Sequence, residues 1–307
     1  CPGAPSISHL FFADDSVLLM RAWIEEALEL KRILQVYERC SGQCVNHEKS
    51  AVMFSKNSSG QTKGSVKCAL GIDREAYNEK YMGLLVYIGR SKRKAFSYLK
   101  DRIWNHMQGW NERTLSRQGK EILVKGVAQA VPTFAMSVFY LTKTFCEELS
   151  SMIARYWWSQ QDKDNKVHWV SWQKLTRSKG RGGLGFRDIE LFNLALLARH
   201  AWRIFHEPSS LSARILKAPY FPDNTILEAE LGPRPSQIWR ATIRGRDVLK
   251  QGIIRRIGNG ESTDIWADEW IPKETTPRPI TSLIANPPLK VSELVEPATG
   301  SWNVDLV

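Results

Sequence analysis

The spacing of apolar residues changes near residue 92, and this change limits the folds open to the chain. Beyond that point, Phe96, Leu99, Ile103, Met107 and Trp110 follow at steps of three and four, which is the spacing of one helix face. Before it, short apolar runs stand on either side of one long amphipathic segment. The sequence therefore predicts an α+β chain, with a partial sheet first and mainly helices later.

The first part of the chain predicts a hairpin, a helix and two further strands. Residues 10–12 and 17–20 form the expected hairpin, and residues 23–40 carry helical spacing with acids in the first turn. Residues 50–55 and 80–89 are predicted strands, the second closed by Gly89, with a polar loop between them. Together these elements make half of an α+β sheet domain.

The second part of the chain predicts helices joined by polar segments. Helices are expected over about 118–131, 144–158 and 188–205, and Pro132 interrupts the first of them. The polar run 159–166 is the clearest linker.

Two glycine-containing segments predict turns. Asn259-Gly260, within residues 253–266, is a hairpin signal. The segment "GRGGLG" at 180–185 has the spacing of a dinucleotide fingerprint, but it follows charged residues rather than a strand, and no βαβ unit surrounds it. We therefore expect a turn before a helix at this position.

Two adjacent carboxylates, Asp14 and Asp15, lie at the tip of the predicted hairpin, in a connection formed by residues 13–16. Aspartate is a common turn residue whose side chain caps its own backbone, which is one interpretation of the pair. The other is a metal site, because Mg²⁺ prefers hard oxygen ligands and, held between carboxylates and substrate phosphates, serves polymerases. The two residues alone leave both interpretations open.

The charge of the chain points to a polyanionic partner. With 43 basic and 32 acidic residues the net charge is +11, and the pI is near 9.5. Nucleic acid is the partner that such a charge favours, although the charge says nothing about fold.

The cysteines and the apolar runs indicate the compartment. Five cysteines, an odd number in a chain of 307 residues, do not make a disulfide framework. Cys40, Cys44 and His47 lack the paired spacing of a zinc site, so free thiols and no structural metal are expected. No apolar run reaches the roughly 18 residues of a membrane span, and no signal peptide is evident. We expect an intracellular protein without a membrane partner, in the nucleus or else in the cytoplasm.

Seven blocks of sequence, taken in order, resemble the C-terminal part of the reverse transcriptase of plant LINE-type (non-LTR) retrotransposons. The resemblance runs from about Ile7 to Pro272, and the order of the blocks makes it specific. The blocks are "FFADD", "SGQCVNHEKS", "KYMGLLVYIGRSK", "GWNERTLSRQGKEILVKGVAQAVPTFAMS", "YWWS", "VHWVSWQKLTRSKGRGGLGFRDIELFNLALLARHAWRIF" and "IRRIGNGESTDIWADEWIP".

The resemblance implies an RNA-directed DNA polymerase fragment of four regions. Residues 1–89 would be the C-terminal part of the palm, 90–158 a helical thumb, and 167–272 a helical connection region with a terminal hairpin. Residues 273–307 would form a Pro-rich tail. Its partners would be an RNA template, a DNA primer and deoxynucleoside triphosphates, with two Mg²⁺ ions as cofactors.

The resemblance also implies roles for single residues. Asp14 and Asp15 match the catalytic, metal-binding aspartates of the palm hairpin. Lys49 matches a catalytic lysine that neutralises triphosphate charge or donates a proton to the leaving pyrophosphate; the alternative is one lysine of a basic chain. Gly83 matches a primer-grip glycine that lets the backbone approach the nucleic acid, and a plain bulge glycine is the alternative.

The segment 90–125, in the expected thumb, concentrates the positive charge. It holds ten cations against three acids, and a solvated helix surface is the alternative to a phosphate-binding face. A second basic stretch, 240–256, is a weaker candidate for the same role. The cations of the first segment are Arg90, Lys92, Arg93, Lys94, Lys100, Arg102, Arg113, Arg117, Lys120 and Lys125.

The resemblance leaves part of such an enzyme unaccounted for. A two-metal polymerase needs a third carboxylate and a nucleotide-reading segment, which in this family precede the aspartate hairpin, and only 13 residues precede Asp14. We therefore expect a fragment that is inactive alone. A non-catalytic nucleic-acid-binding protein and a non-functional truncated element are the alternatives.

Overall fold

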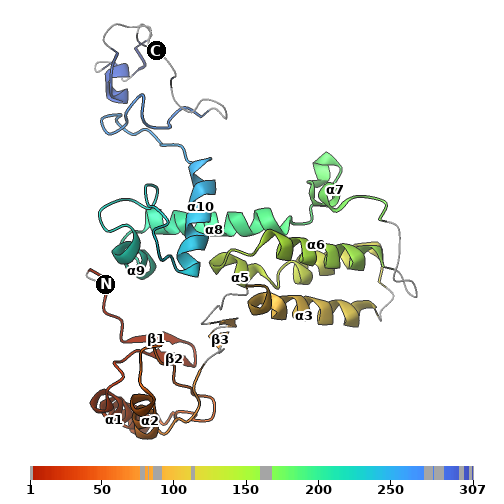
Figure 1. Ribbon diagram of the computed structural model, residues 1–307. Coiled ribbons are helices and arrows are strands. Elements are labelled where there is room, and N and C mark those ends of the chain that lie inside the picture. Colours follow the sequence, from red (N-terminus) through yellow and green to blue (C-terminus); the bar gives the residue numbers. More distant parts are fainter. Residues whose placement is uncertain are drawn as a thin grey trace.

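The structure is a computed structural model of the 307-residue chain, and it has an α+β fold dominated by helices. Within the described residues the strands form two separate two-stranded antiparallel sheets (Figure 1). The structure describes residues 3–76, 80, 81, 83–85, 92–111, 115–159, 168–272, 279, 287–296, 301–303 and 306.

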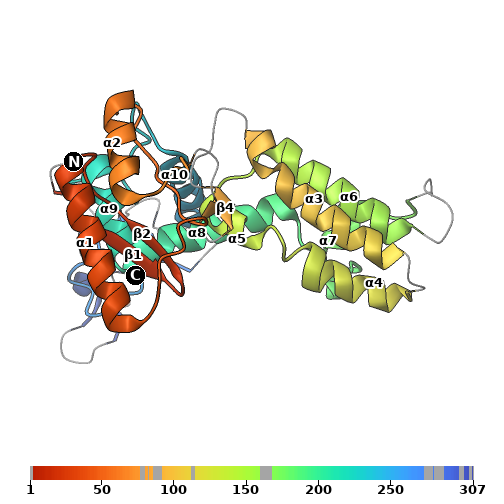
Figure 2. The same ribbon diagram turned by 90° about the horizontal axis from the view of Figure 1, so that it is seen from below.

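The first sheet is the predicted hairpin. Strand β1 (His9–Phe12) pairs with β2 (Asp15–Leu18), with Phe12 opposite Asp15. Helices α1 (Ile24–Ser41) and α2 (Gly60–Leu70) lie side by side next to it, as both ribbon views show (Figures 1 and 2). The small core of this unit is formed by Ala27 of α1 and by Val66 and Leu70 of α2.

Two expectations for the first part of the chain are wrong. Residues 50–55 form no strand; within them Val52 alone makes an isolated parallel bridge, to Glu75. The expected polar loop contains helix α2, because Ser59 caps its first turn and its few apolar residues pack against α1. In contrast, helix α1 matches its prediction and ends at Gly42, whose φ is 72°.

The second sheet replaces the predicted continuous strand 80–89. Strands β3 (Lys80–Tyr81) and β4 (Leu84–Leu85) pair antiparallel across a turn at Gly83, whose φ of 79° suits glycine. Residues 86–90, including Gly89, lie outside the described residues.

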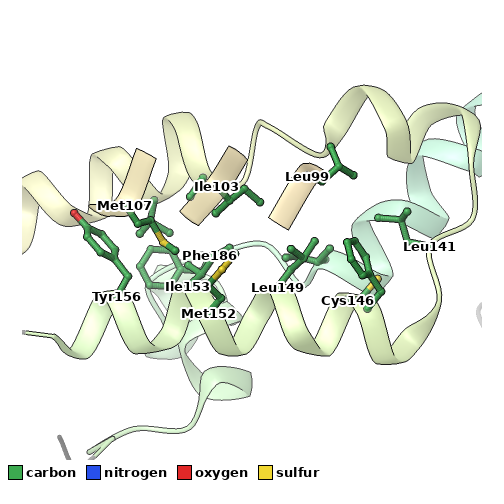
Figure 3. Close-up of a cluster of buried hydrophobic side chains, with 14 of the residues drawn as sticks. Leu99, Ile103, Met107, Leu141, Cys146, Leu149, Met152, Ile153, Tyr156 and Phe186 are labelled. Carbon is green, nitrogen blue, oxygen red and sulfur yellow. The ribbon is translucent and has the colours of Figure 1, made fainter. Parts of the chain in front are cut away.

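The helical unit begins with α3 (Lys92–Asn111) and returns along α6 (Lys143–Trp158) (Figure 2). Leu99, Ile103 and Met107 of α3 face Leu149 and Ile153 of α6, which confirms the predicted apolar face (Figure 3). The two helices bury these residues almost completely, and this contact forms the main core of the chain.

The predicted helix 118–131 is divided. It forms α4 (Arg117–Leu123) and then a π-helical turn, η1 (Val124–Ala128), in which the Gln129 N–H donates to the Val124 carbonyl. Pro132 precedes α5 (Thr133–Val138).

The main core extends beyond residue 158, where the thumb was expected to end. Phe186 packs between Trp157 of α6 and Trp172 of α7 (Trp172–Thr176), with ring centroids 5.2 Å from each. The expected linker at 159–166 lies largely outside the described residues. One hydrophobic core therefore holds side chains from both sides of the expected boundary.

The last helices form a second core. Helix α8 (Ile189–His206), which was predicted, is followed by α9 (Leu211–Tyr220) and α10 (Gln237–Lys250), which were not. Helix α10 crosses α8 (Figure 1), and Trp239 of α10 is completely buried.

The helices have strong local start signals. The first turns are capped by the side chains of Ser59, Ser116, Thr142, Ser171, Asp188, Ser210 and Ser236.

The hairpin expected at Asn259-Gly260 is wrong. Gly260 has a φ of 80° in a bend, and a Cβ there would lie 2.5 Å from the Ser292 backbone nitrogen. The bend instead approaches η3 (Val291–Leu294), a short 3-10 helix within the expected Pro-rich tail that packs on Ile265. Part of that tail therefore belongs to a small core of its own, the fourth among the described residues.

A search of the described residues finds no helix that is both long and apolar enough to cross a membrane.

Candidate active site and nucleic-acid interface

Asp14 and Asp15 occupy the tip of the β1–β2 hairpin. The loop between the strands consists of Ala13 and Asp14, and Asp15 begins β2 opposite Phe12. Ala13 has a φ of 51°, an uncommon value for a residue other than glycine. A positive φ at the first loop position is a feature of the tight turns that join hairpin strands. The hairpin geometry thus fixes the position of both carboxylates.

Neither carboxylate has a partner in the part of the chain that the structure describes. Asp14 and Asp15 are exposed, and within the described residues neither side chain makes a hydrogen bond or an ion pair. A turn aspartate that caps its own backbone would accept such a bond. Backbone capping therefore does not explain the pair in this structure.

The two carboxylates are of a chemical type that binds hard cations. Carboxylate oxygens are ligands of Mg²⁺, which often takes one or two carboxylates and completes its shell with water and substrate phosphates. Among the residues that the structure describes, no group of three His, Cys, Asp or Glu side chains is arranged to hold a metal ion. Asp14 and Asp15 would thus supply two carboxylates to an ion whose other ligands come from elsewhere.

The hairpin exposes an apolar surface beside the carboxylates. Phe11 is 67% exposed and Phe12 is 55% exposed, and Leu10 and Leu19 are also exposed. Two strands alone bury too little to be stable, so such a hairpin normally packs against further structure.

Lys49 lies in the loop after α1. Its backbone N–H donates to the side-chain oxygen of Asn46 at 3.1 Å, and its side chain is exposed. In this part of the described chain, no hydrogen bond or ion pair joins Lys49 to Asp14 or Asp15.

Gly83, the predicted primer-grip residue, lies in the β3–β4 turn. Its carbonyl accepts a hydrogen bond from the Tyr98 hydroxyl at 3.5 Å. No described atom lies within 4 Å of the position that a Cβ would take. Within the described chain, the positive φ explains why glycine suits this position.

Several predicted phosphate-binding cations form ion pairs or hydrogen bonds with other parts of the protein. Arg93 and Lys100 of α3 both pair with Glu148 of α6, at 2.6 and 3.3 Å. Lys120 donates to the Ser159 carbonyl at 2.6 Å, near the end of α6. These contacts join α3 and α4 to α6, and Glu148 partly neutralises Arg93 and Lys100.

Two further predicted cations lie against the main core. Lys125 pairs with Glu121 at 2.7 Å and donates to the Leu184 carbonyl at 2.6 Å. Arg117 lies over the rings of Trp157 and Trp158, 5.6 and 5.2 Å from their centroids.

The structure describes the side chains of two of the remaining cations of segment 90–125. Lys94 and Arg102 are exposed on α3. Arg90, Arg113 and the side chain of Lys92 lie outside the described residues.

The weaker basic stretch, 240–256, is also largely engaged. Arg246 pairs with Asp247 at 2.6 Å, and Arg255 pairs with Asp268 at 2.7 Å. Arg244 lies 4.5 Å from the centroid of the Tyr140 ring.

A third basic segment was not predicted from the sequence. Residues 174–187 hold five cations and no acid: Lys174, Arg177, Lys179, Arg181 and Arg187. Its signal in the sequence is the excess of cations over acids across these residues.

The described cysteines form no disulfide. Cys40, Cys44 and Cys68 are exposed, whereas Cys146 is buried in the main core. Burial raises the pKa of the Cys146 thiol to about 12, and nearby carboxylates act in the same direction.

Comparison with known proteins gives two relatives, and no family model matches the sequence. The chain is 30% identical over 185 residues to the protein named "Putative ribonuclease H protein At1g65750" of Arabidopsis thaliana, in a match that covers 59% of the chain and 30% of that protein. It is 46% identical over 152 residues to the uncharacterized mitochondrial protein AtMg00310 of Arabidopsis thaliana, covering 49% of the chain and 99% of that protein. The chain therefore belongs to the same family as the uncharacterized mitochondrial protein AtMg00310.

Proposed function

We propose that the chain is the C-terminal palm, thumb and connection part of a reverse transcriptase of a plant LINE-type retrotransposon. Such an enzyme copies RNA into DNA by transferring nucleotides to a primer 3′-hydroxyl. The observation that supports the proposal most is the exposed Asp14–Asp15 pair at the tip of a tight hairpin, without structural partners among the described residues. The ordered sequence blocks around this pair add to that support.

The two aspartates would have unequal roles. When bound, Mg²⁺ would supply activation of the primer hydroxyl and would offset the charge of the leaving pyrophosphate. Asp14 lies in the loop and Asp15 starts β2, so the two carboxylates stand on different parts of the hairpin. Asp14 would be the principal ligand of the ions, and Asp15 would be a peripheral one. Lys49 would contribute a positive charge near the triphosphate.

The name of one relative, a ribonuclease H protein, is compatible with this proposal. Ribonuclease H and reverse transcriptase act on the same RNA–DNA hybrid, but the chain spans only 30% of the protein that carries the ribonuclease name. That activity is therefore not transferred to this chain.

A non-catalytic nucleic-acid-binding protein is the second candidate. The net charge of +11 favours a polyanionic partner whether or not the aspartates are used. The two candidates differ in one respect: only the polymerase requires Asp14.

The test is primer extension by a polypeptide that joins this chain to the upstream palm and fingers of a LINE-type reverse transcriptase. Asp14→Asn is expected to abolish extension, and Asp15→Asn to leave measurable activity, because a neutral amide no longer offsets metal charge. Asp223→Asn, which changes an exposed aspartate in a loop between α9 and α10, is the matched control and should extend normally. Circular dichroism checks that each variant is folded. Normal extension by Asp14→Asn would reject the catalytic proposal.

A further inference from the structure

Helix α7 and the loop that follows it carry three exposed cations without a partner among the described residues. Lys174, Arg177 and Arg181 are exposed, and within the described residues their side chains have no hydrogen-bond or ion-pair partner. The basic segments 90–125 and 240–256 differ from this loop, because many of their cations are paired with acids or lie on aromatic rings.

The backbone of this loop is held in one conformation. The N–H groups of Leu184 and Phe186 both donate to the Leu175 carbonyl, at 3.0 and 3.3 Å. The Gly185 N–H donates to the Arg177 carbonyl at 2.8 Å. A Cβ at Gly183 would lie 2.1 Å from the same carbonyl, so the chain can close here only with glycine. The cations of the loop are therefore presented from a fixed framework.

The loop is also anchored to the main core and to α4. Phe186 is 2% exposed and stacks on Trp172. Lys179 pairs with Glu121 of α4 at 3.1 Å, and Lys125 donates to the Leu184 carbonyl. This anchoring reduces the conformational entropy that the loop would lose on binding a ligand.

An exposed tryptophan lies directly before α7. Trp169 is 80% exposed, whereas its neighbour His168 stacks on Trp158 of α6, with centroids 6.1 Å apart. Trp169 therefore follows a residue that packs on the core and precedes the basic loop in sequence. Its own ring is exposed to solvent. Aromatic rings beside cations are the combination that binds single-stranded nucleic acid, because bases stack on the rings while cations contact phosphates.

We propose that Trp169 and the cations Lys174, Arg177 and Arg181 form a binding surface for single-stranded nucleic acid, named here the 169–181 surface. The three cations contact consecutive parts of the phosphodiester backbone, and Trp169 stacks on an unpaired base. Glycines at 180 and 182, with no described atom within 4 Å of their Cβ positions, leave room for the strand to approach the backbone. This inference rests on the proposed function for the class of its partner.

The experiment measures binding of the full chain to a fluorescein-labelled single-stranded RNA by anisotropy at several salt concentrations. The loop variant combines Lys174→Gln, Arg177→Gln and Arg181→Gln. The control combines Arg214→Gln, Lys217→Gln and Arg234→Gln, which removes the same charge from exposed positions outside the basic segments. The loop variant should bind about tenfold more weakly, and the slope of log K against log salt should fall by about 2. The control should change affinity less than about twofold.

A second variant tests base stacking. Trp169→Leu should weaken binding to the single strand by about fivefold or more, with the salt slope unchanged, since no phosphate contact is lost. Binding to a duplex of the same sequence should be unaffected, because its bases are already stacked. Equal losses for the single strand and the duplex would overturn the stacking role.

Three outcomes would overturn the 169–181 surface. They are equal weakening by the loop variant and the control, no binding of the wild-type chain to RNA or single-stranded DNA, and tighter binding to vesicles of equal parts phosphatidylcholine and phosphatidylserine than to RNA. None of these outcomes depends on Asp14, so primer extension tests the proposed function separately. A loop variant that loses binding while the joined polypeptide never extends a primer would retain the surface and reject the polymerase.

Discussion

Gly245 of α10 lies directly against the backbone of Leu197 of α8. A Cβ at Gly245 would lie 2.2 Å from both the carbonyl carbon and the carbonyl oxygen of Leu197, which is closer than atoms can approach. The two helices therefore cross with their backbones in contact, and this contact depends on the absence of one methyl group.

Gly245→Ala should destabilise the chain by about 1–3 kcal/mol, because the added carbon forces α10 away from α8. Gly109→Ala is the control: this helical glycine of α3 has no described atom within 4 Å of its Cβ position. That control should be neutral or stabilising by up to about 1 kcal/mol. Urea unfolding followed by circular dichroism gives both values, and the same sign for both would contradict the close crossing.

Asn193 holds the segment between α5 and α6 in place from α8. Its amide donates to the carbonyls of Met136 and Phe139, at 2.7 and 2.9 Å, and its oxygen accepts from the Leu141 N–H at 2.9 Å. Asn193→Ala should cost about 2–4 kcal/mol, because buried backbone groups lose their partners.

The control for Asn193→Ala is Asn224→Ala, at an exposed position in a loop, which should change stability by less than about 0.5 kcal/mol. Hydrogen exchange adds a local measurement, since the Leu141 amide should lose protection in the first variant. Retained protection there would show that another group satisfies this amide.

Glu121 should make stability depend on pH. Hydrogen bonds from Lys125 and Lys179 lower the pKa of Glu121 below its ordinary value of 4.5. A lowered folded-state pKa contributes stability that is present above pH 4.5 and is lost as the pH falls through the folded-state pKa. The Tm of Glu121→Gln should therefore lie below that of the wild type near neutral pH, and the gap should close in acid. A gap that persists unchanged at the lowest pH would argue against this ion pair as the cause.

Cys146 should resist alkylation while the chain is folded. Its thiol is buried and its pKa is raised to about 12, so the reactive thiolate is scarce near neutral pH. Iodoacetamide should modify the exposed Cys40, Cys44 and Cys68 first, and Cys146 only after addition of denaturant. Peptide mapping by mass spectrometry distinguishes these sites, and equal rates at Cys146 and Cys68 would contradict the burial.

The parts of the fold that could be predicted are those with strong local patterns. The apolar face of α3 and the position of α8 follow from helical spacing, and the hairpin follows from two apolar runs around Asp14 and Asp15. Helix α2 was missed because its sequence contains two glycines and only two buried residues, so its helical pattern is weak.

The π-helical turn could not be predicted, because a contact distant in sequence accompanies it. The Gln129 side chain donates to the Arg187 carbonyl and accepts from the Arg187 N–H, across 58 positions of the sequence. Gln129 is buried at the end of the turn, so its backbone position must suit this contact as well as the local helix.

The candidate site was predictable to the same limited extent. The tip of the hairpin was located from sequence, whereas the engagement of the cations was not. Lys100 meets Glu148, Lys120 meets Ser159, and Lys125 meets the Leu184 carbonyl, across 48, 39 and 59 positions respectively. Charge counting along a segment cannot detect partners at such separations, and it therefore overestimates the charge available to a ligand.

The position of Phe186 between Trp157 and Trp172 determines how the molecule can be divided. A polypeptide that stopped at the end of α6 would retain α3 and α6 but would leave Trp157 facing water and an empty space where the Phe186 ring belongs. It would also lack the Asn193 side chain that satisfies the Leu141 amide. The smallest independently folding piece of the helical unit therefore extends through α8, and expression of shorter pieces should yield unfolded or aggregating material.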